Sequence, residues 1–168
     1  MIQLKRGEKM NRKIIVSIFF ALLGLVLNLL IHEGSHFLFL NICNGNFVDG
    51  SFGTESFISG YVDVKYIPLV ALSSIFIPLT ISCILMFVKQ LYVQTFCCAF
   101  TISTFMNSLL GLIMNFFEKN TATRGTYDVL LAADYSNNSV FVLFITFVFL
   151  VVSGIVIGFN MKRIVDSF

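Results

Sequence analysis

Two histidines and a glutamate stand close together near the end of the first apolar run of this chain. They form the pattern His-Glu-Gly-Ser-His over residues 32–36, and the sequence contains no other histidine. On a helix, His32 and His36 lie one turn apart on the same face, so both imidazoles can bind one metal ion. Glu33 stands beside them and is expected to take a proton from a metal-bound water.

The same three residues admit a simpler interpretation. Two histidines at a helix end could form only hydrogen bonds, while Glu33 faces water. An ionisable group in a lipid-soluble helix is costly, however, and such groups usually serve a function. The position of the pattern within an apolar run therefore favours a metal site.

A third ligand must come from elsewhere in the chain. A catalytic zinc usually has three protein ligands and one position for water. Because no third histidine exists, the remaining ligand must be a carboxylate or a cysteine. Asp128 precedes the short apolar stretch 129–133, which could form a helix that dips toward the other helices; a solvated loop charge is the alternative. The full set of candidates is Asp128, Asp134, Glu118, Asp63, Cys43, Cys83, Cys97 and Cys98.

The elements that position these residues are expected to lie in a membrane. Hydrophobic residues make up 57% of the 168 residues and charged residues only 12%, and a soluble domain of this size could not bury so much apolar surface. Four segments reach the roughly 20 residues that span a bilayer as a helix. They cover about 14–42, 67–88, 91–117 and 140–160. We therefore predict an all-α polytopic membrane protein with a single domain over residues 1–168.

Charge predicts the orientation of these helices. Basic residues cluster before the first apolar run, at Lys5, Arg6, Lys9, Arg12 and Lys13, and others follow at Lys89, Lys162 and Arg163. Such residues favour the cytoplasmic side. Both termini are then cytoplasmic, most simply in the cell membrane, and the histidine pattern lies toward the exoplasmic end of the first helix. A net charge of only +2 argues against a nucleic-acid partner.

The segment 44–66 differs from its surroundings. Glycines interrupt it, Asp49-Gly50 is a turn signal, and residues 61–66 alternate as a strand does. We expect one or two short β-hairpins at the membrane surface, with an ordinary loop as the alternative. In the third helix, small and polar residues recur along one side, either for close helix packing or to line the site. These residues are Thr101, Thr104, Ser108, Gly111 and Asn115, and Asn28 lies one turn before His32.

Taken in order, these elements resemble the intramembrane metalloproteases of the site-2 protease type. The likeness covers residues 14–133 and comprises His32 to His36 in a membrane helix, the glycine-rich strand-like segment after it, and Asn115 followed by Asp128. The resemblance implies Zn²⁺ held by His32, His36 and Asp128, with Asp134 as the alternative to Asp128. It also implies that Asn115 binds the substrate backbone or stabilises an oxyanion.

The activity implied by the resemblance is hydrolysis of peptide bonds in membrane-associated protein or peptide substrates, with Glu33 activating a zinc-bound water. The strand-like segment could receive an unwound substrate as an added strand. Two alternatives are kept. The chain is a catalytically inactive relative, or it is a small non-enzymatic membrane protein such as a transport accessory or an immunity factor.

Overall fold

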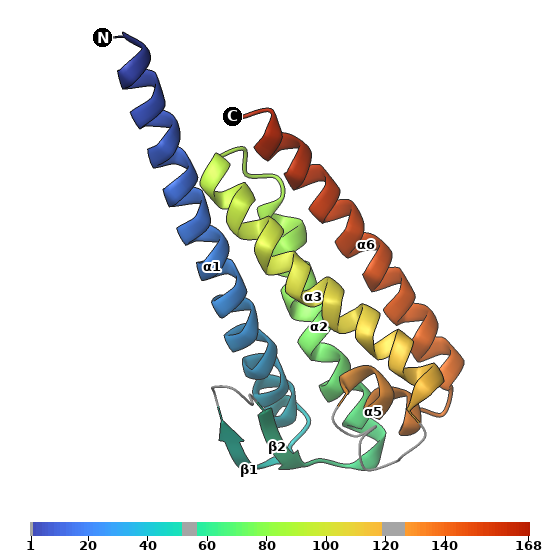
Figure 1. Cartoon of the computed structure of the whole chain (residues 1–168). Coiled ribbons are helices and arrows are strands. Elements are labelled where there is room, and N and C mark those ends of the chain that lie inside the picture. Colours follow the sequence, from blue (N-terminus) through green and yellow to red (C-terminus); the bar gives the residue numbers. More distant parts are fainter. Residues whose placement is uncertain (1, 52–56, 119–126) are drawn as a thin grey trace.

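The computed structural model describes residues 2–51, 57–118 and 127–168, and four long helices dominate this part of the chain. They are α1 (Ile2–Ile42), α2 (Ile67–Leu85), α3 (Leu91–Phe117) and α6 (Ser139–Val165). Each is long and apolar enough to cross a membrane. Figure 1 shows them as a bundle, with α3 packed against α1, α2 and α6. The expected all-α polytopic fold is confirmed.

Three helix boundaries differ from the expectation, and one of them is the end of α6, which lies at Val165 rather than near residue 160. Helix α1 begins at Ile2 rather than near residue 14, because no proline interrupts the polar residues before the apolar run and Lys, Arg and Glu are good helix formers. Helix α2 ends at Leu85 rather than 88, and residues 86–90 connect it to α3. Phe87 and Val88, which were assigned to the helix for their hydrophobicity, are exposed in this connection.

A single antiparallel β-hairpin follows α1, with strands β1 (Asn46–Ser51) and β2 (Phe57–Tyr61). Two details of the prediction are wrong. Asp49 and Gly50 lie within β1, just after a bulge, so they do not form the turn; residues 52–56, which join the strands, lie outside the described residues. Residues 64–66 form a short 3₁₀ helix rather than a strand, because the Asp63 side chain accepts a hydrogen bond from the Lys65 amide and caps it.

The hairpin packs directly on the end of α1. Asn44 adopts a left-handed conformation (φ 56°), and the Gly45 amide donates to the Leu40 carbonyl at 2.8 Å, which ends the helix. A Cβ on Gly45 would stand 2.6 Å from the Leu40 side chain, and one on Gly60 would meet the same side chain. These two glycines therefore allow the strands to approach the buried Leu40 and fix the hairpin beside α1.

A short helix, α5 (Asp128–Asp134), lies at the same end of the bundle as the hairpin (Figure 1). The expected helical stretch after Asp128 is thus confirmed. Its alanines Ala132 and Ala133 are buried against Ala71 of α2 and Val142 of α6. Small residues on both sides let the helices approach closely. This packing fixes α5 in the bundle and, with it, the position of Asp128 at the start of the helix.

The opposite end of the bundle gathers both chain termini and the connection 86–90 (Figure 1). Lys13 Nζ of α1 donates to the Ser167 carbonyl at 3.3 Å, and the Arg163 guanidinium of α6 donates to the Met86 carbonyl at 2.6 Å. The basic residues that predicted a common side for the termini are therefore brought together. The side chains of residues 2–9, which include Lys5, Arg6 and Lys9, lie outside the described residues.

Candidate metal centre

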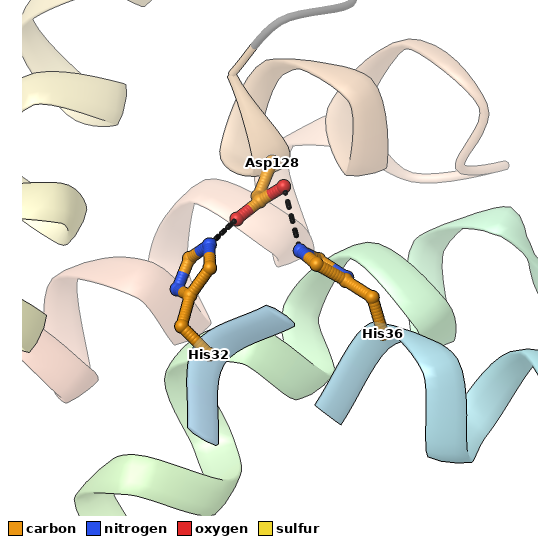
Figure 2. A group of neighbouring side chains, drawn as sticks. All are labelled: His32, His36 and Asp128. Atoms are coloured by element: carbon orange, nitrogen blue, oxygen red, sulfur yellow. Dashed lines mark ion pairs between the residues drawn. The ribbon is translucent and has the colours of Figure 1, made fainter. Parts of the chain in front are cut away.

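Helices α1 and α5 bring His32, His36 and Asp128 together. Asp128 Oδ2 lies 3.2 Å from Nε2 of His32, and Asp128 Oδ1 lies 3.3 Å from Nε2 of His36. Figure 2 shows the carboxylate between the two rings, which point toward it from successive turns of α1. The three side chains are 12–19% exposed, so the group is largely buried but reachable. It forms a set of ligands that could hold a metal ion.

The spacing of the ligand atoms fits a small transition-metal ion. Zinc binds nitrogen and oxygen ligands at about 2.0–2.1 Å, so neighbouring ligands of a tetrahedral site stand about 3.3 Å apart. The Nε2 atoms of His32 and His36 lie 3.2 and 3.3 Å from different oxygens of the Asp128 carboxylate, and one ligand atom from each residue lies within 4.8 Å of the other two, so the three residues stand close enough to be drawn onto one ion. Two imidazoles and one carboxylate also match a zinc ligand set that leaves a fourth position for water.

Each ligand is held by one further contact. The Val70 carbonyl lies 3.0 Å from His36 Nδ1, and because a carbonyl only accepts, Nδ1 is the donor of this hydrogen bond and Nε2 is the ring nitrogen that faces Asp128. The Asn107 side-chain amide lies 3.5 Å from His32 Nδ1, and Ser74 Oγ donates to Asp128 Oδ2 at 2.7 Å. Such outer contacts orient metal ligands and fix their tautomers. The group therefore has the outer contacts that a metal centre requires.

Helix α2 supplies two of these three contacts. Val70 and Ser74 are four residues apart and so occupy the same face of one helical turn. That turn reaches His36 of α1 through a backbone carbonyl and Asp128 of α5 through a hydroxyl. One turn of α2 therefore sets the position of the two ligands relative to each other.

The electrostatics of the group favour an ionised carboxylate. Burial by itself raises the pKa of Asp128, but the charges and hydrogen bonds of His36 and His32 outweigh it and hold that pKa below its ordinary value. Glu33 is also buried, with a side chain only 6% exposed and Oε1 3.7 Å from His32 Nε2. A second carboxylate thus stands beside the group without belonging to it.

The other candidate ligands are elsewhere. Asp134 is exposed at the end of α5, six residues after Asp128, and Asp63 forms an ion pair with Lys65 at 3.1 Å. In the described part of the chain, His32, His36 and Asp128 form the group that could hold a metal ion. The cysteines and Glu118 do not belong to this group.

The polar side of α3 packs mainly against other helices. Asn28 of α1 donates to Thr104 at 2.9 Å, and a Cβ on Gly111 would meet Val129 of α5. Thr101 and Ser108 donate to carbonyls of their own helix. Asn115 is partly buried near the end of α3, eight residues after Asn107. Close packing is therefore what the stripe provides, and Gly111 provides it beside Val129, the neighbour of the candidate ligand Asp128.

The sequence interpretation missed Asn107, Ser74 and the Val70 carbonyl. Asn107 had a usable signal, since an amide in a lipid-soluble helix needs a partner. It was missed because it lies just beside the regular spacing of the polar stripe. Ser74 is one of several serines in α2, and a backbone carbonyl leaves no trace in a sequence.

No protein-family model matches this chain, and no curated protein or solved structure matches it either. The arguments for function therefore come from the residues and geometry of the candidate metal centre.

Proposed function

We propose that this protein is a membrane-embedded metallopeptidase of the site-2 protease type. His32, His36 and Asp128 hold Zn²⁺, and Glu33 is the proton acceptor. The observation that carries this proposal is the convergence of two helices, far apart in sequence, on a three-ligand group with a buried glutamate beside it. A pair of histidines that served only as hydrogen-bonding residues would not require a carboxylate placed between both rings.

A Zn²⁺ held by His32, His36 and Asp128 would supply Lewis-acid chemistry for the scissile carbonyl and for an attacking water. The Glu33 carboxylate accepts a proton from that water and passes it to the amine nitrogen as the peptide bond breaks. The hydroxyl remains on the carbonyl carbon, so one water is consumed for each bond cleaved. Burial of Glu33 keeps bulk solvent away from the proton while it is held.

The location of the centre suits substrates that enter from the membrane. His36 precedes the end of α1 by six residues, a rise of about 9 Å, so the group lies inside the bundle close to the hairpin end. Strands β1 and β2 lie beside this end, and an extended substrate segment could add to one of their edges. Asn115, near the end of α3, is assigned to the substrate backbone or the developing oxyanion.

The charge distribution supports an orientation for the proposed enzyme. The end of the bundle with both termini and the 86–90 connection is assigned to the cytoplasm (Figure 1), because the segments that meet there carry Arg12, Lys13, Lys89, Lys162 and Arg163. The metal group then lies toward the exoplasmic face of the cell membrane.

A single substitution tests the proposed activity. Glu33→Gln removes the proton acceptor and leaves all three ligands, so the purified variant should retain wild-type zinc and lose at least about a hundredfold in cleavage rate. Cleavage is measured by mass spectrometry on synthetic single-span peptides in detergent micelles. Glu118→Gln, at the end of α3, is the matched control and should cleave as the wild type does.

Two results would contradict the proposal. Cleavage by Glu33→Gln at the wild-type rate would remove Glu33 from the chemistry. A wild-type protein that binds about one zinc per chain and cleaves none of the peptides, nor proteins of its own membrane, would be a metal-binding relative without activity.

A further inference from the structure

Five cationic side chains gather at the end of the bundle opposite the metal centre. They come from three parts of the chain, namely α1, the connection 86–90 and α6. Figure 1 shows these three parts at the same end of the molecule. We call this set the cationic rim, and its members are Arg12, Lys13, Lys89, Lys162 and Arg163.

Among the described residues, no acidic side chain pairs with these cations. None of the five forms an ion pair in the described part of the chain, where the ion pairs involve His32, His36 and Lys65. Asp166, which directly follows α6, takes no part in the ion pairs of the described residues. Like charges held together by a fold repel one another and attract anions from outside.

Two members of the rim are held in place by neutral groups. The Arg163 guanidinium donates to the Met86 carbonyl at 2.6 Å and stacks over the Phe159 ring at 3.9 Å. Lys13 donates to the Ser167 carbonyl at 3.3 Å. A guanidinium has five N–H donors, so Arg163 keeps donors for a phosphate after binding Met86. Two cations of the rim are therefore held in positions from which they can bind an anion.

Exposed apolar side chains adjoin the cations. Ile14 follows Lys13 and is 41% exposed, and Phe87 and Val88 precede Lys89 and are 69% and 40% exposed. Met161 and Val165 flank the basic pair of α6 and are also exposed. A soluble anion would leave these surfaces uncovered, whereas the acyl chains of a lipid would cover them while its phosphate meets the cations.

We propose that the cationic rim binds anionic phospholipids, with the headgroup phosphates between α1, the 86–90 connection and α6 and the acyl chains on the adjoining apolar surface. These lipids act as the counterions that hold the three parts together. Basic clusters next to membrane helices recognise anionic headgroups by the same chemistry. The proposal is independent of the metal centre, which lies at the other end of the bundle.

Thermal unfolding in a neutral detergent tests the proposal. Cys97 and Cys98 are buried, at 0% and 5% exposure, so a thiol-reactive fluorophore reports unfolding. Dioleoyl phosphatidylglycerol is the probe, and the same titration with dioleoyl phosphatidylcholine or inorganic phosphate separates a lipid site from a site for a free anion. A lipid that binds the folded state raises the midpoint temperature of unfolding, and a lipid that binds more tightly raises it more.

The variant to compare removes four charges and spares Arg163, which also contacts Met86 and Phe159. It combines Arg12→Gln, Lys13→Gln, Lys89→Gln and Lys162→Gln. Its control keeps the charges by exchanging Lys and Arg at the same four positions. If the fourfold variant does not fold, the pairs 12/13 and 89/162 are tested separately.

Phosphatidylglycerol should raise the wild-type midpoint more than phosphatidylcholine does, and inorganic phosphate should have no such effect. Each neutralised cation should weaken the response about fivefold, so the fourfold variant should need several hundred times the lipid (about 600-fold if the four losses multiply), while the charge-keeping control matches the wild type. Equal stabilisation by both lipids, an unchanged response in the fourfold variant, or full stabilisation by inorganic phosphate would overturn the proposal. Stabilisation by poly-glutamate in place of lipid would do so as well and indicate an acidic protein partner.

Discussion

Gly111→Ala should weaken metal binding although Gly111 touches neither the metal ligands nor Glu33. Gly111 lies on α3, where α5 packs against it. A Cβ at this position would stand 2.5 Å from Cγ2 of Val129 and 2.6 Å from its Cβ. Rotation of the valine side chain moves Cγ2 but leaves Cβ in place, so the clash can be relieved only if the two helices separate.

The size of the effect follows from these distances. Carbon atoms in contact stand about 3.5–4.0 Å apart, so α5 must move by about 1 Å. Val129 is 1% exposed and follows Asp128 directly, so the carboxylate moves with it. Ligand distances in metal sites are held within about 0.2 Å. We therefore expect a loss of metal affinity of about 10–100-fold, the range seen when ligand orientation is disturbed, with about 1–3 kcal/mol of lost stability.

The assay is zinc binding to the purified protein in competition with a fluorescent chelator, with helix content followed by circular dichroism. Gly34→Ala is the matched control, because it makes the same change inside the histidine pattern at a glycine whose added Cβ would meet no atom within 4 Å beyond its chain neighbours and the backbone of its own helix. Gly34→Ala should bind zinc as the wild type does. A Gly111→Ala variant with wild-type affinity would refute the reasoning that the contact between α3 and α5 positions Asp128.

Three further predictions concern the same end of the bundle and the helix interface beside it. Ser74→Ala removes the hydroxyl that donates to Asp128 and should lower zinc affinity about tenfold or more. Ser153→Ala is the control, because its hydroxyl donates within α6, and it should leave zinc affinity unchanged. Equal effects of the two substitutions would contradict the role assigned to Ser74. Removing metal with EDTA should lower the midpoint temperature of unfolding of the wild type but not that of His36→Ala. A shift of the same size in both proteins would mean that the stabilising ion binds at another site. Thr104→Ala removes the hydrogen-bond acceptor of the buried Asn28 amide and should lower the free energy of unfolding by about 0.6–2 kcal/mol in a detergent unfolding titration. Thr80→Ala, at an exposed position, is the control. A loss no larger than that of Thr80→Ala would mean that the Asn28 amide has another hydrogen-bond partner.

The membrane spans were readable from the sequence because each is a long apolar run, and that signal does not depend on tertiary contacts. The carboxyl-terminal end of α2 was harder to predict from the sequence, because Phe87 and Val88 are as apolar as the helix they follow. In the hairpin, Asp49-Gly50 has turn chemistry but lies in β1, where the strand is bulged and the Gly50 amide bonds to the Asp49 carboxylate. Local composition therefore predicted the β-hairpin correctly but placed its turn at the wrong residues.

In the candidate metal centre, too, the residues with a local sequence signal were predicted and the contacts between distant helices were not. The histidines and Glu33 were found from their spacing on one helix, which is a local property. Asp128 could only be ranked among several acidic residues, because its approach to the histidines depends on the packing of α5 against α2, α3 and α6. The contacts of Val70, Ser74 and Asn107 depend on which helix faces which, and that information exists only in the assembled bundle.

X-ray absorption at the zinc edge tests the central claim most directly. The protein is purified with zinc, and the spectra of the wild type and of Asp128→Ala are compared. Two imidazole nitrogens and oxygen ligands at about 2.0–2.1 Å, without sulfur, are expected in the wild type, with about one zinc per chain and a marked loss of zinc in the variant. A sulfur shell near about 2.3 Å, a single imidazole, or a protein that retains no zinc would contradict the account.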